Sequence, residues 1–282
     1  CLASPLRDVY KRQVEYKKPA ELKRMADAGV VLREALDETV AAVKPGVTTL
    51  ELDQVFRGVL DRHGAQSNFL GYHGFPATIC TSVNDEVVHG IPGERVLQDG
   101  DVLKIDGGAI VDGWHADSAR TVLIGEVSPE DQRLSDITRE AMWAGIAAAA
   151  SARFVGQIGQ AIEASVLDQG GHDLGILEDY CGHGIGSEMH MAPDVLNYAA
   201  DYRGPRIKPG MALAIEPMLV TGGLDTKTLA DDWTVVTTDG GRASQWEHTV
   251  LFHRGGIWVS TAEDGGAADL ARYGVTPTPI QA

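Results

Sequence analysis

An Asp-Gly pair between two runs of β-forming residues, within residues 101–124, constrains the fold of this chain more than any other feature. The pair is a strong signal for a two-residue type I′ turn, so we expect a β-hairpin with Asp112 and Gly113 at its tip. A loop of two residues also fixes the strand register, which places Gly108 opposite Asp117. The chain is therefore expected to contain a long antiparallel pair of strands.

The same hairpin carries two acids on one face. Side chains alternate along a strand, so Asp106, Gly108 and Asp117 point to the same side, and the diagonal between the two acids spans roughly 7–8 Å. Gly108 is expected to leave the space between the carboxylates empty. Two converging carboxylates repel each other unless a cation lies between them, which predicts a metal site. The alternative is a surface hairpin whose acids are merely solvated.

The composition is typical of a folded globular protein, with 282 residues of which 44% are hydrophobic and 23% charged. A formal net charge of -16 disfavours a nucleic-acid interface, so we expect no specific nucleic-acid partner. The cysteines show no disulfide-framework spacing, which favours a reducing, cytoplasmic setting. We find neither an apolar run of membrane length nor a signal-peptide layout, so we expect no membrane association.

The two ends of the chain are expected to lie outside the main domain. Residues 1–13 are interpreted as a non-native leader, because Asp8 to Gln13 matches one reading frame of a transposon-end adapter used in sequencing libraries. Residues 266–282 form a C-terminal tail that is poor in acids and is expected to fray. A single catalytic domain is predicted between them, at residues 14–265.

Helix signals occur twice in the same order. In each half, apolar residues at three- and four-residue spacing predict two helices, after which the sequence turns to glycine and strand-forming residues. This order suggests an internal duplication, with pseudo-repeats at about residues 20–127 and 128–262. The four helices are expected at about residues 20–44, 49–63, 129–154 and 158–168.

The second half supplies further candidate ligands. Asp106 and Glu216 each follow a glycine by six residues, with Leu and Ile in matching positions, so each half is expected to present an acid at the same place in a strand. His183 lies in a glycine-rich stretch, where a histidine is more often a turn residue than a ligand. Glu247 is expected inside an otherwise apolar strand, where an unpaired carboxylate is costly. One imidazole and four carboxylates suit a pair of Mn, Fe, Co or Zn ions.

Six short motifs in this chain resemble those of the type I methionine aminopeptidases, in order and in spacing over about residues 14–262. The resemblance implies an α+β class and the pita-bread fold, in which two pseudo-symmetric halves surround a curved antiparallel sheet covered by helices. The motifs are His89-Gly-Ile-Pro92, Ile105-Asp-Gly-Gly108, Trp114-His-Ala-Asp117, Gly182-His-Gly-Ile-Gly186, Ile215-Glu-Pro-Met218 and Trp246-Glu-His-Thr249.

The resemblance also implies how the ligands share two divalent metal ions. Asp106 and Asp117 are expected to chelate one ion, and His183 and Glu216 to complete the coordination of the other. Asp117 and Glu247 are expected to bridge the two ions. Five side chains can serve two ions only if two of the carboxylates bridge.

Catalytic and substrate-binding roles follow from the same resemblance. Glu216 is expected to move the proton of the attacking water, while His190 donates to the carbonyl oxygen and His89 holds the scissile amide. Met189 and Phe75 stand where the family commonly has an aromatic residue and a tyrosine. The resemblance therefore predicts the shape of the pocket less closely than it predicts the metal ligands. The substrate pocket is expected to be lined by Tyr72, Phe75, Cys80, His89, Met189, His190 and Trp233, with Phe69 near its wall.

The implied function is removal of the N-terminal methionine from nascent proteins whose second residue is small. The expected partners are N-terminal peptides of nascent chains, with the ribosome as a further candidate, and the expected state is a monomer. One alternative is a prolidase or Xaa-Pro aminopeptidase, which uses the same five ligands but usually carries a large additional N-terminal domain. The other is a non-catalytic binding module of the same fold, although such relatives typically lose ligands.

Overall fold

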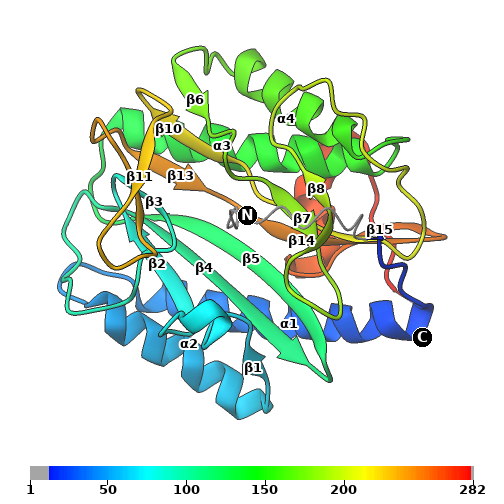
Figure 1. The fold of residues 1–282 in the computed structure, drawn as a ribbon, viewed down its shortest axis with the longest axis horizontal. Coiled ribbons are helices and arrows are strands. Elements are labelled where there is room, and N and C mark those ends of the chain that lie inside the picture. The colour runs from blue at the N-terminus through cyan, green and yellow to red at the C-terminus, as the bar shows by residue number, and fades with distance from the viewer. Residues whose placement is uncertain (1–12, 281–282) are drawn as a thin grey trace.

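A computed structural model describes residues 13–280, so residues 1–12 of the predicted leader lie outside the described part of the chain. Strands occupy the middle of the molecule, with α1 and α2 below them and α3 and α4 above them (Figure 1). All the pairings between strands are antiparallel in the described residues. The prediction of an α+β class with antiparallel sheets is confirmed.

The first half begins with two helices whose ends follow from local sequence. Thr48 and Glu51 form a reciprocal capping box at the start of α2, and Gly64 closes that helix in a left-handed conformation with φ of 63°. Both predicted helices are present within a few residues of the expected bounds. The elements of this half are α1 (Pro19–Ala42), α2 (Thr49–His63), β1 (Gln66–Ser67), η1 (Tyr72–Gly74), β2 (Ile79–Val83), β3 (Glu86–Val88), β4 (Val102–Val111) and β5 (Trp114–Leu123).

The hairpin of β4 and β5 has the predicted turn and register. Asp112 and Gly113 both have positive φ, 49° and 78°, as a type I′ turn requires. Gly108 lies opposite Asp117. The register therefore follows directly from the length of the loop.

The second half repeats the order of two helices followed by antiparallel strands. The duplication itself stays a prediction, because a shared element order does not demonstrate common origin. The elements are α3 (Pro129–Ala149), α4 (Gly156–Asp168), β6 (Leu174–Ile176), β7 (Gly182–Gly184), β8 (Met191–Val195), β9 (Ala212–Ile215), β10 (Met218–Thr221), β11 (Thr226–Thr228), β12 (Val235–Thr237), β13 (Ala243–Gln245), β14 (His248–His253), β15 (Gly256–Val259), η2 (Glu263–Gly266), α5 (Ala267–Leu270) and η3 (Ala271–Tyr273).

The expected end of α3 was wrong, since the helix stops at Ala149 rather than near residue 154. The backbone N–H groups of Arg153 and Phe154 donate to Oε1 of Gln157 at 2.8 and 3.0 Å. Phe154 also forms an isolated β-bridge with Arg206. Because the backbone groups of Arg153 and Phe154 bond to these partners, they do not continue the helix. The spacing of apolar residues along a helix does not indicate such partners.

The strands form four hydrogen-bonded sheets, ordered β1-β4-β2 with β5 on β4, β13-β10-β6, β11-β12-β3 and β15-β14-β9-β7-β8. Hydrogen bonds between β5 and the β13–β14 segment join the two halves. The backbone N–H of Glu247 donates to the carbonyl of Ala119 at 3.0 Å, and the Thr249 hydroxyl donates to the carbonyl of Asp117 at 2.8 Å. This seam places the acidic face of the hairpin against the second half.

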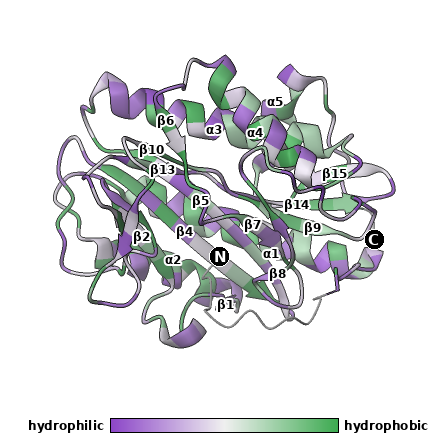
Figure 2. Cartoon of the chain, turned by 45° about the horizontal axis from the view of Figure 1, so that its top comes forward, coloured by the Kyte–Doolittle hydropathy of each residue, from purple (hydrophilic) through white to green (hydrophobic). Residues whose placement is uncertain are grey.

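The two largest hydrophobic cores of the described residues lie one in each half, while a smaller cluster packs Leu22 and Met25 of α1 against Leu251 of β14. Leu36, Phe56 and Leu103 belong to the core of the first half, whereas Trp143 and Leu213 belong to that of the second. Hydrophilic residues interrupt the hydrophobic strands β4 and β5 (Figure 2). Because two packed cores hold the strands from outside, the inner surface between them can carry polar groups.

The C-terminal segment after residue 265 was expected to fray, and this was wrong for the residues that the structure describes. Leu270 of α5 is fully buried, and the backbone N–H of Thr278 donates to the carbonyl of Ile257 at 2.9 Å. The tail is therefore docked on the second half. Among the described residues, no helix combines the length and the apolar character that crossing a membrane requires.

Candidate metal centre and substrate pocket

The structure brings the five predicted ligands together at the seam between the halves. Asp106, Asp117 and Glu247 form one group whose ligand atoms lie within 4.8 Å of one another, and His183, Glu216 and Glu247 form a second. Glu247 belongs to both groups. Nε2 of His183 lies 3.4 Å from Oε1 of Glu216 and 3.9 Å from Oδ2 of Asp117, so Asp117 also reaches the second group.

Asp117, Glu216 and Glu247 are buried and Asp106 is half-buried, so the charges of these carboxyl groups are poorly solvated. Burial raises the pKa of Asp106 to about 7 and that of Glu216 to about 8. Burial, followed by repulsion from the neighbouring carboxylates, raises the pKa of Asp117 and that of Glu247 well above their ordinary values. A bound cation would therefore stabilise the ionised form of these carboxyl groups.

Three of these carboxyl groups each leave one buried oxygen without a hydrogen-bond partner among the described residues. The atoms are Asp106 Oδ1, Asp117 Oδ1 and Glu247 Oε1. Buried polar atoms almost always have a partner, so these orphaned oxygens indicate that something is bound between them. Four carboxylates and one imidazole suit first-row divalent ions. The residues present thus fit two divalent metal ions.

Backbone contacts fix the orientation of His183. Its Nδ1 lies 2.9 Å from the carbonyl oxygen of Gly184, which can only accept, so Nδ1 carries the proton and Nε2 keeps its lone pair for a metal. Burial lowers the pKa of His183 to about 4, so the ring is neutral. A Cβ on Gly184 would lie 2.1 Å from the carbonyl oxygen of Ala192, which explains the glycine beside this ligand.

Two details of the predicted ligand strands were wrong. Glu216 was expected within a strand, but β9 ends at Ile215, since Pro217 has no N–H with which to continue the pairing. Glu247 was likewise expected inside a strand and instead lies in the short break between β13 and β14. Both ligands therefore lie at strand ends.

The expected empty space beside Gly108 was also wrong. A Cβ at this position would lie 2.4 Å from Nδ2 of Asn68, whose side chain fills the space and donates to the carbonyl of Ala116 at 3.0 Å. Asn68 comes from the segment after β1, and nothing in the hairpin sequence points to it. The glycine is needed because another side chain packs there.

Gln245 is a residue of the centre to which the sequence assigned no role. Its side-chain nitrogen lies 3.4 Å from Oδ2 of Asp106 and 3.5 Å from Oε2 of Glu216, so it links one carboxylate from each half. The residue is 1% exposed. Its position two residues before Glu247, in the strand that the sequence predicts, was the available signal, since alternate residues of a strand share a face.

A cavity opens directly beside the ligands, and the predicted pocket residues line it. Phe75 and Trp233 pack edge to face with their ring centroids 5.0 Å apart, and Phe69 meets Phe75 at 6.3 Å. Tyr180 and Met218 also line the cavity and were not predicted. The predicted residues on its wall are Phe69, Tyr72, Phe75, Cys80, His89, Met189, His190 and Trp233.

Two histidines face this cavity in the neutral form. Burial lowers the pKa of His89 to about 4, and burial together with the neighbouring His183 lowers the pKa of His190 to about 2. His190 also has a ligand atom within 4.8 Å of those of Asp117 and His183, a third possible metal group that the sequence did not predict. The tautomer of His190 therefore decides between a ligand and a hydrogen-bond donor.

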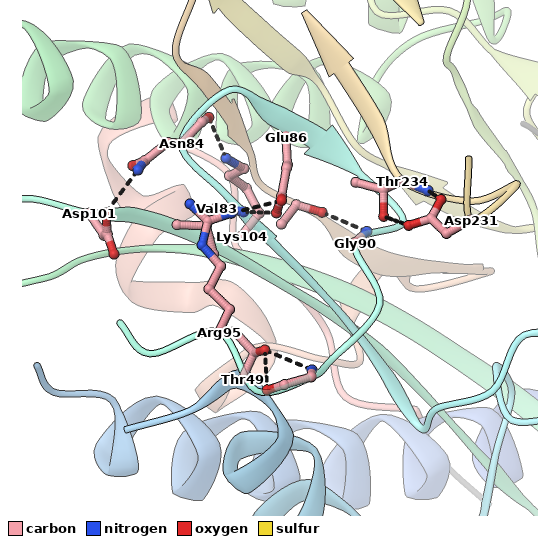
Figure 3. A network of polar contacts seen from close by, with 12 residues as sticks. Thr49, Val83, Asn84, Glu86, Gly90, Arg95, Asp101, Lys104, Asp231 and Thr234 are labelled. Atoms are coloured by element: carbon pink, nitrogen blue, oxygen red, sulfur yellow. Dashed lines mark hydrogen bonds and ion pairs between the residues drawn. The ribbon is translucent and has the colours of Figure 1, made fainter. Parts of the chain in front are cut away.

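A polar network fixes the segment that carries His89 (Figure 3). Nζ of Lys104, on β4, donates to the carbonyl of Asn84 at 2.8 Å, and the Asn84 side chain donates to Asp101 at 2.8 Å. Gly90 donates from its N–H to the Ser82 hydroxyl at 3.0 Å. The turn before His89 and the residue after it are thus both tied to neighbouring strands.

Comparison with known proteins gives the same assignment over most of the chain. The model of metallopeptidase family M24 matches residues 23–254. Methionine aminopeptidase 1 of Mycobacterium tuberculosis (strain CDC 1551 / Oshkosh) is 47% identical over 244 residues, which are 85% of this chain and 92% of that protein.

Solved structures agree with this match, and methionine aminopeptidases resemble the chain more closely than a prolidase does. The methionine aminopeptidase from Rickettsia prowazekii superposes with a TM-score of 0.84 at 36% identity, over 89% of this chain and 100% of that chain. The prolidase from Pyrococcus furiosus reaches a TM-score of 0.70 at 19% identity, over 88% of this chain and 65% of that chain. At this identity, the similarity to the prolidase is one of fold alone.

Proposed function

Since the chain belongs to metallopeptidase family M24, we propose that Asp106, Asp117, His183, Glu216 and Glu247 hold two divalent metal ions for peptide hydrolysis. The chain is an aminopeptidase that removes N-terminal methionine. One observation carries the assignment of these residues: four carboxyl groups, three of them buried, and a neutral imidazole meet beside an aromatic pocket. These five residues are the ones that would hold the two ions, as the resemblance implies.

Two bound divalent ions would supply an activated water and polarisation of the carbonyl group. The side chains of the protein would transfer protons and stabilise the charge that develops on the substrate. Glu216 accepts a proton and passes it to the leaving amine. Burial raises the pKa of Glu216 to about 8 in the metal-free chain, so its site favours the protonated form. Gln245 donates to Glu216 and to Asp106, which holds the two carboxylates in place.

His190 and His89 act as neutral hydrogen-bonding groups. Their lowered pKa values keep both rings uncharged at neutral pH, so they orient the peptide and stabilise developing charge without themselves carrying a charge. His190 donates to the carbonyl oxygen, and His89 holds the scissile amide. Both side chains line the cavity next to the carboxylates.

The pocket explains the preference for methionine. Methionine is unbranched and polarizable, which suits a slot walled by Phe75, Trp233 and the sulfur atoms of Cys80 and Met189. A residue branched at the γ carbon fits such a slot poorly, and one misfitted group is worth about 1–3 kcal/mol. A compact metal centre also leaves little space for a large second residue.

The partners are N-terminal peptides. We further propose that the chain meets them at the ribosome, in the cytoplasm and as a monomer. Arg203, Arg206 and Lys208 lie exposed in a stretch of residues 203–208 that contains no acid, which gives this acidic chain a local basic surface for phosphate groups. Co-sedimentation with ribosomes tests this, and an Arg203→Glu, Arg206→Glu double variant that still co-sediments fully would refute this contact surface.

Three peptides test the function itself. With Mn or Co supplied, we expect cleavage of Met-Ala-Ser, little cleavage of Met-Lys-Ser and none of Ala-Pro-Ala, as followed by mass spectrometry. Leu-Ala-Ser should be cleaved about 10- to 200-fold less efficiently than Met-Ala-Ser. Preferential cleavage of Ala-Pro-Ala would favour the proline-directed alternative, and inactivity on all peptides with metal bound would favour the binding module.

A further inference from the structure

The hydroxyl of Tyr72 and the ring of His190 meet across the seam between the two halves. Oη of Tyr72 lies 2.9 Å from Nδ1 of His190, and their ring centroids are 5.4 Å apart. Tyr72 begins η1 in the first half, and His190 directly precedes β8 in the second. Both side chains line the cavity beside the carboxylates, so this contact lies on the wall of the proposed substrate pocket.

A neutral histidine has one proton to place, and its position changes what the ring can do. If Nδ1 carries the proton and donates to Tyr72, Nε2 of His190 keeps a lone pair and can bind a metal. If the Tyr72 hydroxyl donates to Nδ1, Nε2 carries the proton and can only donate. The first arrangement would make His190 a ligand together with Asp117 and His183, and the second would make it a donor to the substrate.

His183, in contact with His190 at a centroid distance of 4.4 Å, provides the internal comparison. Its Nδ1 faces the carbonyl oxygen of Gly184, an acceptor without a proton, so that ring must donate from Nδ1 and expose a bare Nε2. Nδ1 of His190 faces a hydroxyl instead, which has a proton to give. The two neighbouring rings thus differ in the partner of Nδ1, a carbonyl oxygen for His183 and a hydroxyl for His190.

The chemistry of the pair favours donation by the hydroxyl. A phenol O–H is a stronger acid than the N–H of a neutral imidazole, and the bare imidazole nitrogen is a stronger base than a phenol oxygen. The stronger donor therefore pairs with the stronger acceptor when Tyr72 donates to His190.

We propose that Tyr72 is a positioning residue that fixes His190 in the Nε2–H tautomer. In this form His190 stays out of metal coordination and directs its proton at the carbonyl oxygen of the scissile bond. This role of the hydroxyl is additional to the role of the Tyr72 ring as a wall of the methionine pocket. The inference rests on the proposed function, which supplies the carbonyl group.

Tyr72→Phe separates the two roles, because it removes the hydroxyl and keeps the ring. We expect kcat on Met-Ala-Ser to fall about 10- to 100-fold, as for other partners that orient a catalytic histidine, while KM changes less than about threefold. Tyr202→Phe is the matched control, since its hydroxyl donates to the carbonyl of Asp194 outside the cavity, and it should keep the wild-type kcat. An unchanged kcat in Tyr72→Phe, or a rise in KM alone, would overturn the proposal.

Nuclear magnetic resonance of the zinc-loaded protein, with histidine labelled by ¹⁵N, reads the tautomer without any turnover. We expect the His190 signals, assigned by their loss in a His190→Gln variant, to show a proton on Nε2, and those of His183 to show one on Nδ1. A proton on Nδ1 of His190 would refute the inference. If the wild-type protein failed to cleave Met-Ala-Ser, the proposed function would fail, but this tautomer would still be measured.

Discussion

The two halves of the proposed metal centre are built in different ways. Asp106 and Asp117 come from a single hairpin whose two-residue turn sets their register. His183, Glu216 and Glu247 come from three segments, each at or next to a short strand. The positions of the first two residues depend on residues close in sequence. The positions of the other three depend on packing against distant parts of the chain.

This difference shows where each half is vulnerable. The hairpin needs only its turn and its alternation to present two acids on one face. The second half depends on close backbone approach, as at Gly184, where any side chain would meet the carbonyl of Ala192. We expect substitutions in the first half to change chemistry while the fold survives, and substitutions in the second half to change both.

The largest effect is expected from Asp117→Asn, because Asp117 comes from the hairpin yet reaches the ligands of both halves. Several kcal/mol of charge stabilisation depend on the ions, so kcat should fall at least about 1000-fold while circular dichroism stays unchanged. Calorimetric titration with Mn should show weakened binding. Asp112→Asn at the exposed tip of the same hairpin is the control and should keep full activity. Normal turnover by Asp117→Asn would exclude this site.

The second prediction concerns pH in the metal-free protein, where both halves contribute raised pKa values. Asp106 has a pKa of about 7 and Glu216 of about 8 in the folded chain, against about 3.9 and 4.3 when unfolded. The folded state holds these protons more tightly. Stability is therefore greatest below the unfolded values and falls as pH rises toward the folded ones, by up to about 1.4 kcal/mol per pH unit for each group.

Urea denaturation between pH 4.5 and 7.5 measures this slope. Divalent ions bind the deprotonated carboxylates, so the stability gained on adding Mn should grow with pH, opposite to the trend of the metal-free protein. Asp106→Asn, on the hairpin, should reduce the slope of the metal-free protein by about one group. A metal-free protein that becomes more stable over this range would contradict the burial of these carboxyl groups.

The third prediction compares two glycines, one beside the ligands of each half. Gly184→Ala would place a methyl group 2.1 Å from a backbone carbonyl that cannot move aside, and should cost about 1–3 kcal/mol of unfolding free energy and weaken metal binding. Gly108→Ala would meet Nδ2 and Cγ of Asn68 at 2.4 and 2.6 Å, which can rotate away, and its Cβ at 2.9 Å, which needs only a small shift, so a smaller loss is expected. Adding Asn68→Ala should reverse part of that loss. Equal costs at the two glycines would remove the distinction between the halves.

What the sequence predicted follows the same division. The hairpin turn and its register depend on residues within a few positions of one another, and both are confirmed. The five ligands come together at the seam, although their binding of metal stays a prediction. Local features, whose residues all lie in one segment, could therefore be predicted from the sequence.

What the sequence did not predict depends on contacts between distant segments. The early end of α3 reflects a bridge between Phe154 and Arg206, and the packing beside Gly108 depends on Asn68. The docking of the tail rests on Thr278 meeting Ile257. Periodicity describes one element at a time, and it does not indicate which remote residue will complete that element.

The smallest effect is expected at the helix caps, where the two halves should behave alike. The Thr48 hydroxyl accepts from the N–H of Glu51 at 3.2 Å, and the Ser128 hydroxyl accepts from the N–H of Asp131 at 3.0 Å. Thr48→Ala and Ser128→Ala should each cost about 0.5–2 kcal/mol in urea denaturation, because each leaves a terminal N–H without its cap. Both helices pack outside the ligand strands, so kcat should stay within about twofold of wild type while stability falls. If Ser128→Ala alone lowered kcat, the helices of the second half would take part in placing its ligands, and the contrast between the halves would extend beyond the strands.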